Sequence, residues 1–262
     1  MTERPDALSG VSVRSAAAAL RGVRRLVVTT GAGMSSESGI PTFRDAGTGL
    51  WARYDPEQLA TAAAFQRHPA RVFGWYAWRR RVVRAARPHP GYHALVALER
   101  LVLEVVIVTQ NVDGLHGRAG SARVLELHGS LERFSCVTQR HPFPAVEVPE
   151  SAADAPCEPP RCQQCGAPVR PDVVWFGEAL PESVARDARH VAASCEAMLV
   201  VGTSGLVQPA AELPFIARAA GATVIEINPT PSAGSAAHIV CRGPAGAVLP
   251  ALVTALTEGE PH

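Results

Sequence analysis

The sequence contains no lysine, which is its most unusual compositional feature. All 25 basic side chains are arginines, and 24 acidic side chains balance them to a formal net charge of +1. Because positive and negative charges nearly cancel, the net charge gives no reason to expect binding to nucleic acid or to an anionic membrane. A GC-rich coding bias accounts for an arginine-only, alanine-rich chain without invoking any function.

Two further absences narrow the class of protein. No window approaches the ~18–20 consecutive apolar residues that span a bilayer. Residues 15–20 are alanine-rich and helix-like, but the longer apolar core and cleavage region of a secretory signal are missing. We therefore expect a cytoplasmic protein. Its 262 residues suit one large domain, or a large domain with a small insertion.

Apolar runs and helical stretches alternate along much of the chain. Runs at residues 25–30, 104–109, 197–202 and 222–227 are apolar on both faces, as in strands that are covered on both sides. Helical stretches lie between them, at residues 89–101, 181–193 and 209–220. This alternation predicts an α/β fold with a parallel sheet.

Two segments interrupt the alternation. Residues 43–87 carry aromatic and arginine side chains at helical spacing, and residues 130–171 are rich in proline and cysteine. We predict that they form a smaller inserted domain, made of a helical module and a cysteine-containing module. The sheet domain would then comprise residues 1–42, 88–129 and 172–262.

Four of the six cysteines fall within thirty residues, namely Cys136, Cys157, Cys162 and Cys165. In a cytoplasmic chain such a cluster favours a metal site over disulfides. Cys195 and Cys241 stand alone in apolar surroundings, and we interpret them as small buried hydrophobic residues.

A glycine loop follows the first predicted strand and precedes a helix. Its glycines, Gly31, Gly33 and Gly39, would let backbone amides approach a pyrophosphate. As a dehydrogenase fingerprint the loop is defective, because Ser36 occupies the third glycine position and no acidic residue ends a second strand ~20 residues later. Taken alone, the loop fits an ordinary tight turn equally well.

Polar residues follow other predicted strands. Gln110, Asn111 and Asp113 come directly after residues 104–109, where an open α/β sheet binds its ligands. His128 lies between a short apolar run and Gly129, where an imidazole can act as a base near neutral pH. A single histidine is, however, more often structural or simply exposed.

When these motifs are considered together, the sequence resembles the sirtuin family of NAD-dependent protein lysine deacylases. Six motifs carry the resemblance in the family's order: residues 31–44, 109–116, 127–130, 170–178, 202–204 and 227–229. The resemblance implies a Rossmann-like sheet domain with NAD across it, and a smaller inserted domain of helical and zinc-ribbon-like modules. It assigns NAD binding to Gly31, Ala32, Gly33, Phe43, Arg44, Gln110, Asn111, Asp113, Gly202, Thr203, Ser204 and Asn228.

The resemblance also implies a reaction, in which NAD is consumed as a co-substrate. The acyl oxygen of a modified lysine attacks C1′ of the ribose as nicotinamide leaves, and Asn111 and Asp113 hold the carboxamide. His128, the general base, then activates a ribose hydroxyl to attack the resulting imidate. The products are free lysine, nicotinamide and O-acyl-ADP-ribose. The acyl-lysine peptide would add as an extended strand between the segment that contains Val174 and Phe176 and the one at residues 205–207.

Tyr76 and Arg79 stand one helical turn apart if residues 70–84 are helical. Among sirtuins, a Tyr-x-x-Arg pair here resembles the subclass that removes succinyl and malonyl groups, since a guanidinium can pair with a carboxylate. In the alternative interpretation, residues 75–81 form an amphipathic helix with an aromatic core face and a solvated basic face.

The cysteine cluster departs from the family pattern. Sirtuins hold a structural zinc with two cysteine pairs, and here Cys162 and Cys165 form one pair, whereas Gln139 replaces the partner of Cys136. Either Cys136, Cys162 and Cys165 bind zinc with Cys157 as a displaced fourth ligand, or the loop folds without metal. His141 is another possible ligand outside the family position.

Other functions stay open beside desuccinylation or demalonylation. They are plain lysine deacetylation, mono-ADP-ribosyl transfer at the same site, and NAD sensing without catalysis. For an enzyme that acts on acylated lysines, the absence of lysine has a further consequence. Regulation through acylation of its own lysine side chains is excluded.

Overall fold

The computed structural model describes residues 10–42, 49–153, 155–230 and 232–258. Its larger part contains a six-stranded parallel sheet with the order β3-β2-β1-β7-β8-β9. The strands are β1 (Arg25–Thr30), β2 (Glu104–Thr109), β3 (Val124–Glu126), β7 (Ala197–Val201), β8 (Thr223–Asn228) and β9 (Ile239–Arg242). The strand order reverses between β1 and β7, and a ligand crevice is expected at such a switch point.

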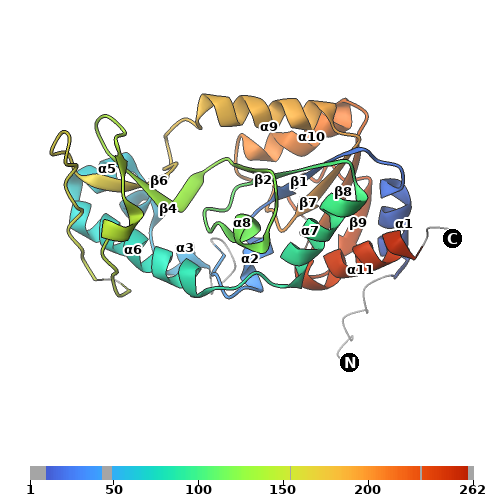
Figure 1. Cartoon of the computed structure of the whole chain (residues 1–262), viewed down its shortest axis with the longest axis horizontal. Coiled ribbons are helices and arrows are strands. Elements are labelled where there is room, and N and C mark those ends of the chain that lie inside the picture. The colour runs from blue at the N-terminus through green and yellow to red at the C-terminus, as the bar shows by residue number, and fades with distance from the viewer. Residues whose placement is uncertain (1–9, 43–48, 154, 231, 259–262) are drawn as a thin grey trace.

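Helices cover both faces of this sheet, because successive side chains of each strand point to opposite faces. On one face, Leu26 and Val28 pack with α1 (Gly10–Leu20), α7 (Pro90–Leu101) and α11 (Ala245–Thr257). On the other, Val27 packs with α9 (Glu182–Ser194) and α10 (Leu213–Ala219). Figure 1 shows α9 and α10 above the sheet and α7 and α11 below it.

The smaller part has its own sheet and its own core. Its antiparallel sheet has the order β5-β4-β6, with β4 (Gly129–Cys136), β5 (Pro142–Phe143) and β6 (Val169–Val173). Its helices are α3 (Leu50–Arg53), α4 (Pro56–Leu59), α5 (Ala62–Arg67) and α6 (Pro69–Ala85). Phe73, Trp75, Leu131 and Trp175 belong to its buried apolar cluster. Figure 1 shows this part at the left, beside the large sheet.

The predicted α/β fold with a smaller second part is confirmed. The expected strands agree with β1 and β2 and differ by one residue from β7 and β8. The sequence did not reveal β3 or β9, because they are short and mostly half-buried. It also did not reveal α11, which is apolar nearly throughout and contains Pro250. The domain boundary expected at residue 172 falls inside β6.

The remaining short elements connect these layers. They are α2 (Gly33–Ser36), α8 (Leu115–Ala119) and the 3-10 turns Ala145–Glu147 and Ala210–Glu212. The expected helix at 209–220 is therefore a 3-10 turn followed by α10. Among the described helices, none is long and apolar enough to cross a membrane.

Candidate active site and metal centre

A cleft of about 1430 Å³ opens at the carboxyl edge of the large sheet and continues to the smaller part. It exceeds the ~300–1,000 Å³ of a pocket for one small ligand, so it has room for two substrates. Most of the sequence-predicted site residues line it: Gly31, Ala32, Gly33, Tyr76, Arg79, Gln110, Asn111, His128, Val174, Phe176, Gly202, Thr203, Ser204 and Asn228. Phe43 and Arg44 lie outside the described residues.

Two glycine loops meet at the switch point between β1 and β7. The Gly33 amide donates to the Gly202 carbonyl at 2.9 Å, and a Cβ on Gly33 would stand 2.8 Å from the Gly202 Cα. Gly202 itself has φ +60. Only glycines permit so close an approach of the two backbones, and the floor of the cleft is therefore bare main chain.

Asn111 is held rigidly at the cleft wall. Its Nδ2 donates to the Gly31 carbonyl and to Ser35 Oγ, both at 2.9 Å, and its backbone amide donates to Thr109 Oγ1 at 3.0 Å. Both side-chain hydrogens are thus used, so the side-chain oxygen is the group that Asn111 can offer to a ligand as an acceptor.

Asp113 lies behind this wall and does not belong to the cleft lining. It is 4% exposed, and its two oxygens accept from Ser35 Oγ at 2.6 Å and from the Leu115 amide at 2.9 Å. Burial raises the pKa of the carboxyl, while these two hydrogen bonds lower it in part. In this structure Asp113 therefore acts on the cleft through Ser35 and Asn111.

His128 has one ring nitrogen engaged and belongs to the cleft lining. Its Nδ1 lies 3.0 Å from the Gln110 carbonyl, which can only accept, so Nδ1 carries the proton and Nε2 is the basic nitrogen. Burial lowers the pKa of the imidazole, and the bond to Gln110 raises it in part. His128 is thus a neutral base of defined tautomer near neutral pH.

Hydrogen bonds to several other segments hold residues 174–178, which follow β6, in place. The Val174 amide donates to the His128 carbonyl at 2.9 Å, and the Phe176 amide donates to the Ala60 carbonyl at 2.8 Å. Glu178 receives two bonds from the guanidinium of Arg170, at 2.5 and 2.8 Å. The Arg170 side chain is 4% exposed and that of Glu178 is 22% exposed, so this bidentate pair is partly shielded from water. The clamp leaves Phe176 48% exposed at the cleft.

Tyr76 and Arg79 both lie on α6 and line the same cleft, as the helical spacing predicted. The Arg79 guanidinium stands 4.8 Å from the Trp75 ring centroid and 5.6 Å from that of Tyr76. Burial raises the pKa of Tyr76 to about 12, so its phenol stays protonated as a donor. Burial also lowers the pKa of Arg79, and Tyr76 and Asp113 partly offset that effect.

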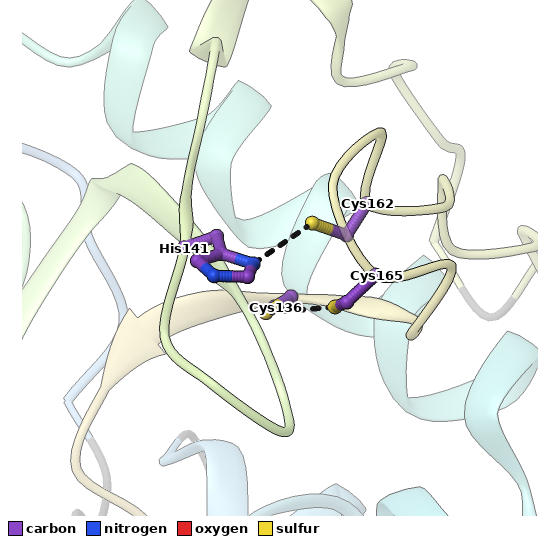
Figure 2. Close-up of side chains that lie close together, drawn as sticks. All are labelled: Cys136, His141, Cys162 and Cys165. Carbon is purple, nitrogen blue, oxygen red and sulfur yellow. Dashed lines mark hydrogen bonds between the residues drawn. The ribbon is translucent and has the colours of Figure 1, made fainter.

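A second cluster lies in the smaller part, away from the cleft. Cys136, His141, Cys162 and Cys165 converge there, with their four ligand atoms within 4.8 Å of one another (Figure 2). The Cys165 and Cys136 sulfurs are 3.7 Å apart, and the Cys162 sulfur lies 3.5 Å from His141 Nδ1. A tetrahedral zinc with bonds of ~2.3 Å to sulfur and ~2.0 Å to nitrogen needs edges of about 3.8 and 3.5 Å. The donor set therefore fits zinc.

Cys157, the fourth ligand expected from the sequence, is not in this cluster. Its amide donates to the Ala70 carbonyl of α6 at 2.8 Å, which holds the segment against the helix. Burial and the nearby Glu158 raise the pKa of its thiol, which disfavours the thiolate that binds metal. The expectation of Cys157 was wrong because sequence proximity was taken for spatial proximity.

His141 reaches the cluster through the turn between β4 and β5. The Cys136 amide donates to the His141 carbonyl at 3.0 Å, which places the two residues opposite each other. Arg140 completes the turn with φ +56, the one positive φ of a non-glycine residue in the described chain. Burial raises the pKa of the Cys136 thiol, but the backbone hydrogen bonds from Gln139 and His141, together with the contact to Cys165, outweigh it and lower the pKa to about 6.

The sequence did not single out several residues that build the cleft. Ser35 accepts a hydrogen bond from Asn111 and contacts the hydroxyl of Tyr92, and Arg186 and Arg189 of α9 line the cleft. Ser35 lies inside the motif at residues 31–44, and this position was a signal in the sequence. Tyr92 gave no signal beyond an apolar place on a helix.

A model of the Sir2 family matches residues 31–209 of this chain. The chain belongs to the Sir2 family. It is 52% identical over 246 residues to NAD-dependent protein deacylase 1 of Pseudomonas aeruginosa, with 92% of this chain and 98% of that protein covered.

Solved structures of the Sir2 family share the fold. A Sir2 homolog–NAD complex is 44% identical, with a TM-score of 0.83 and 93% of each chain covered. The structure of Sir2Af2 bound to a myristoylated histone peptide is 36% identical, with a TM-score of 0.76 and 95% and 97% of the chains covered.

Proposed function

We propose that this Sir2-family chain consumes NAD to remove acyl groups from protein lysines, with a preference for acyl groups that end in a carboxylate. One observation carries the proposal: a single cleft contains the glycine loops, the basic nitrogen of His128 and the Tyr76–Arg79 pair. Relatives named as NAD-dependent protein deacylases, and the related structures that contain NAD or an acylated peptide, support it.

In this proposal the bare backbone of the glycine loops accommodates the pyrophosphate, and Asn111 presents an oxygen to the nicotinamide half. Positive charge develops at C1′ as nicotinamide leaves, and uncharged acceptors such as Asn111 stabilise it better than arginines would. His128 Nε2 then accepts a proton from a ribose hydroxyl, since Nδ1–H is already donated to Gln110. The ribose oxygen bonds to the imidate carbon, the lysine amine leaves, and a water molecule opens the cyclic acyl intermediate. The products are lysine, nicotinamide and O-acyl-ADP-ribose.

The acylated peptide would pair with the clamped segment 174–178. Its extended backbone gains hydrogen bonds there that depend little on sequence. Beyond this segment lie Tyr76 and Arg79, at the end of the cleft nearest α6. A carboxylate on the acyl group would meet the guanidinium and the protonated phenol, which supply both charge and hydrogen bonds.

The acyl preference is tested by Arg79→Met, with Arg81→Met as a matched control on the exposed side of the same helix. We expect kcat/KM on succinyl- and malonyl-lysine peptides to fall by about 10- to 100-fold, the cost of one charge-assisted pair, while acetyl-lysine turnover changes little. Arg81→Met should change neither. Equal losses on succinyl and acetyl peptides would show a plain deacetylase with a structural Arg79.

The same assay separates the other functions. Release of O-acyl-ADP-ribose supports deacylation, whereas labelled ADP-ribosyl protein would indicate transfer. Binding of NAD without release of nicotinamide, in the presence of every acyl peptide, would indicate a sensing module.

We also propose a structural zinc held by Cys136, His141, Cys162 and Cys165. When bound, it would cross-link the β4–β5 turn to the Cys162–Cys165 loop, and no step of the reaction needs it. The cluster of three thiols and one imidazole, rather than four thiols, is the feature that distinguishes this site from the pattern the resemblance implied.

A further inference from the structure

One buried histidine does not line the cleft and has no part in the proposed reaction. His116, on α8, is 2% exposed. Its Nε2 is 3.0 Å from Thr30 Oγ1, which donates to Thr109 Oγ1 at 2.8 Å. Thr109 Oγ1 in turn accepts from the Asn111 backbone amide at 3.0 Å. An unbroken chain of hydrogen bonds therefore links His116 to Asn111.

The direction of this chain determines the tautomer of His116. The single hydroxyl hydrogen of Thr30 is given to Thr109, so Thr30 can only accept from His116 Nε2, which must carry a proton. Nδ1 is buried and has no hydrogen-bond partner among the described residues. Burial, with a smaller contribution from His89, lowers the pKa of His116 to about 3. The ring is thus neutral and protonated on Nε2 throughout the physiological range.

A second contact leads from His116 to the side chain of Asn111. The rings of His116 and Tyr92 meet edge to face, with centroids 4.8 Å apart. Tyr92 Oη lies 3.0 Å from Ser35 Oγ, which gives its own hydrogen to Asp113 and accepts from Asn111 Nδ2. His116 therefore supports both the backbone and the side chain of Asn111.

We propose that His116 is a positioning residue for Asn111, and that its Nε2–H, through Thr30 and Thr109, holds Asn111 in the geometry that NAD cleavage requires. The inference rests on the proposed function. A neutral imidazole suits this place, because it donates a hydrogen bond without adding positive charge close to the developing charge at C1′. A leucine would fill similar space and break the chain, whereas a glutamine can place an N–H where Nε2 stands.

The test compares His116→Leu, His116→Gln and His116→Asn, measuring nicotinamide release with NAD and an acyl-lysine peptide. Losing one buried hydrogen bond corresponds to about tenfold. We expect kcat to fall about tenfold in His116→Leu and in His116→Asn, whose shorter amide cannot reach Thr30. In His116→Gln, kcat should stay within about threefold of wild type, and KM for the peptide should stay constant in all three. Thermal melting gives the folded fraction to which each kcat is normalised.

A merely structural role would lower the melting temperature without changing the normalised kcat. That result, or equal losses in the Gln and Leu variants, would overturn the inference. Nitrogen-15 NMR of histidine-labelled protein adds a readout independent of activity, and a His116 ring protonated on Nδ1 would also overturn it. If the wild-type protein releases no nicotinamide from NAD with any acyl peptide, the proposed function fails. Active wild type with an unaffected Leu variant refutes only the role of His116.

Discussion

The cleft at the sheet edge and the Cys136–His141–Cys162–Cys165 cluster both join distant segments, but different rules assemble them. In the cleft, Gly31, Asn111, Gly202 and Asn228 converge because parallel strands end at one edge of the sheet, and their position at the end of a strand made them predictable. In the cluster, the members depend on which side chain a turn places opposite Cys136. A regular sheet therefore makes its site predictable from the sequence. An irregular turn does not, and here it places His141 rather than Cys157 at the fourth position of the cluster.

The largest expected effect is a loss of turnover, without a loss of stability, on substitution of His128 in the cleft. We expect His128→Ala to lower kcat by about 10²- to 10⁴-fold, the usual contribution of a general base. The melting temperature should hardly move, because His128 is only half-buried and its ring makes one hydrogen bond. Steady-state turnover and calorimetry measure the two quantities. Substantial residual turnover would assign the base to another group.

The second expected effect is a loss of zinc from the Cys136–His141–Cys162–Cys165 cluster, measured by zinc analysis of purified variants. His141→Ala should lower zinc affinity by at least about 100-fold, since even the outer-shell partners of a metal contribute 10- to 100-fold. Cys157→Ser is the matched control and should retain the zinc content of wild type. Loss of zinc from the Cys157 variant, with retention in the His141 variant, would restore the expectation made from the sequence. A metal-free wild type, purified without chelators, would eliminate the site.

The third effect concerns the polar support beneath the cleft. Ser35→Ala removes a hydroxyl that serves Asn111, Asp113 and Tyr92, and it leaves buried polar groups without partners. The free energy of unfolding should fall by about 1–3 kcal/mol. Ser36→Ala, one residue later, removes a single exposed bond to Gly33 and should cost less than about 0.5 kcal/mol. Urea titration measures both free energies of unfolding. Equal losses in the two variants would mean that the buried hydrogen bonds of Ser35 do not stabilise the fold more than the exposed one of Ser36.

The smallest expected effect is a shift in the pH dependence of kcat/KM. Burial lowers the pKa of His128 below the ordinary 6.5, so the neutral, basic form persists as the pH falls through 6.5. The acid limb of kcat/KM should therefore have its midpoint below pH 6.5, and activity should be nearly constant from pH 7 to 8. A midpoint above pH 6.5 would mean that the folded protein stabilises the protonated imidazole.

Much of the cleft could be predicted because its residues occupy short, uninterrupted motifs. Gln110, Asn111 and His128 line it as expected. Asp113 does not, although it belongs to the same motif, because the turn after Asn111 directs it to Ser35 and the Leu115 amide. His116 belongs to the motif at residues 109–116, but the sequence could not show that its ring contacts Thr30. Tyr92 looks like any core position on a helix until its contact with Ser35 is known.

Composition and motif order alone determined the fold class, the family and the absence of any lysine side chain that could be acylated. Apolar runs and glycine loops are local properties, and they carry that information in neighbouring residues. Only the tertiary structure decided that His141, and not Cys157, lies in the cluster and that a chain of hydrogen bonds joins His116 to Asn111. Those facts depend on distances between segments far apart in the chain, which the positive φ of Arg140 and the packing of α8 under the sheet edge establish.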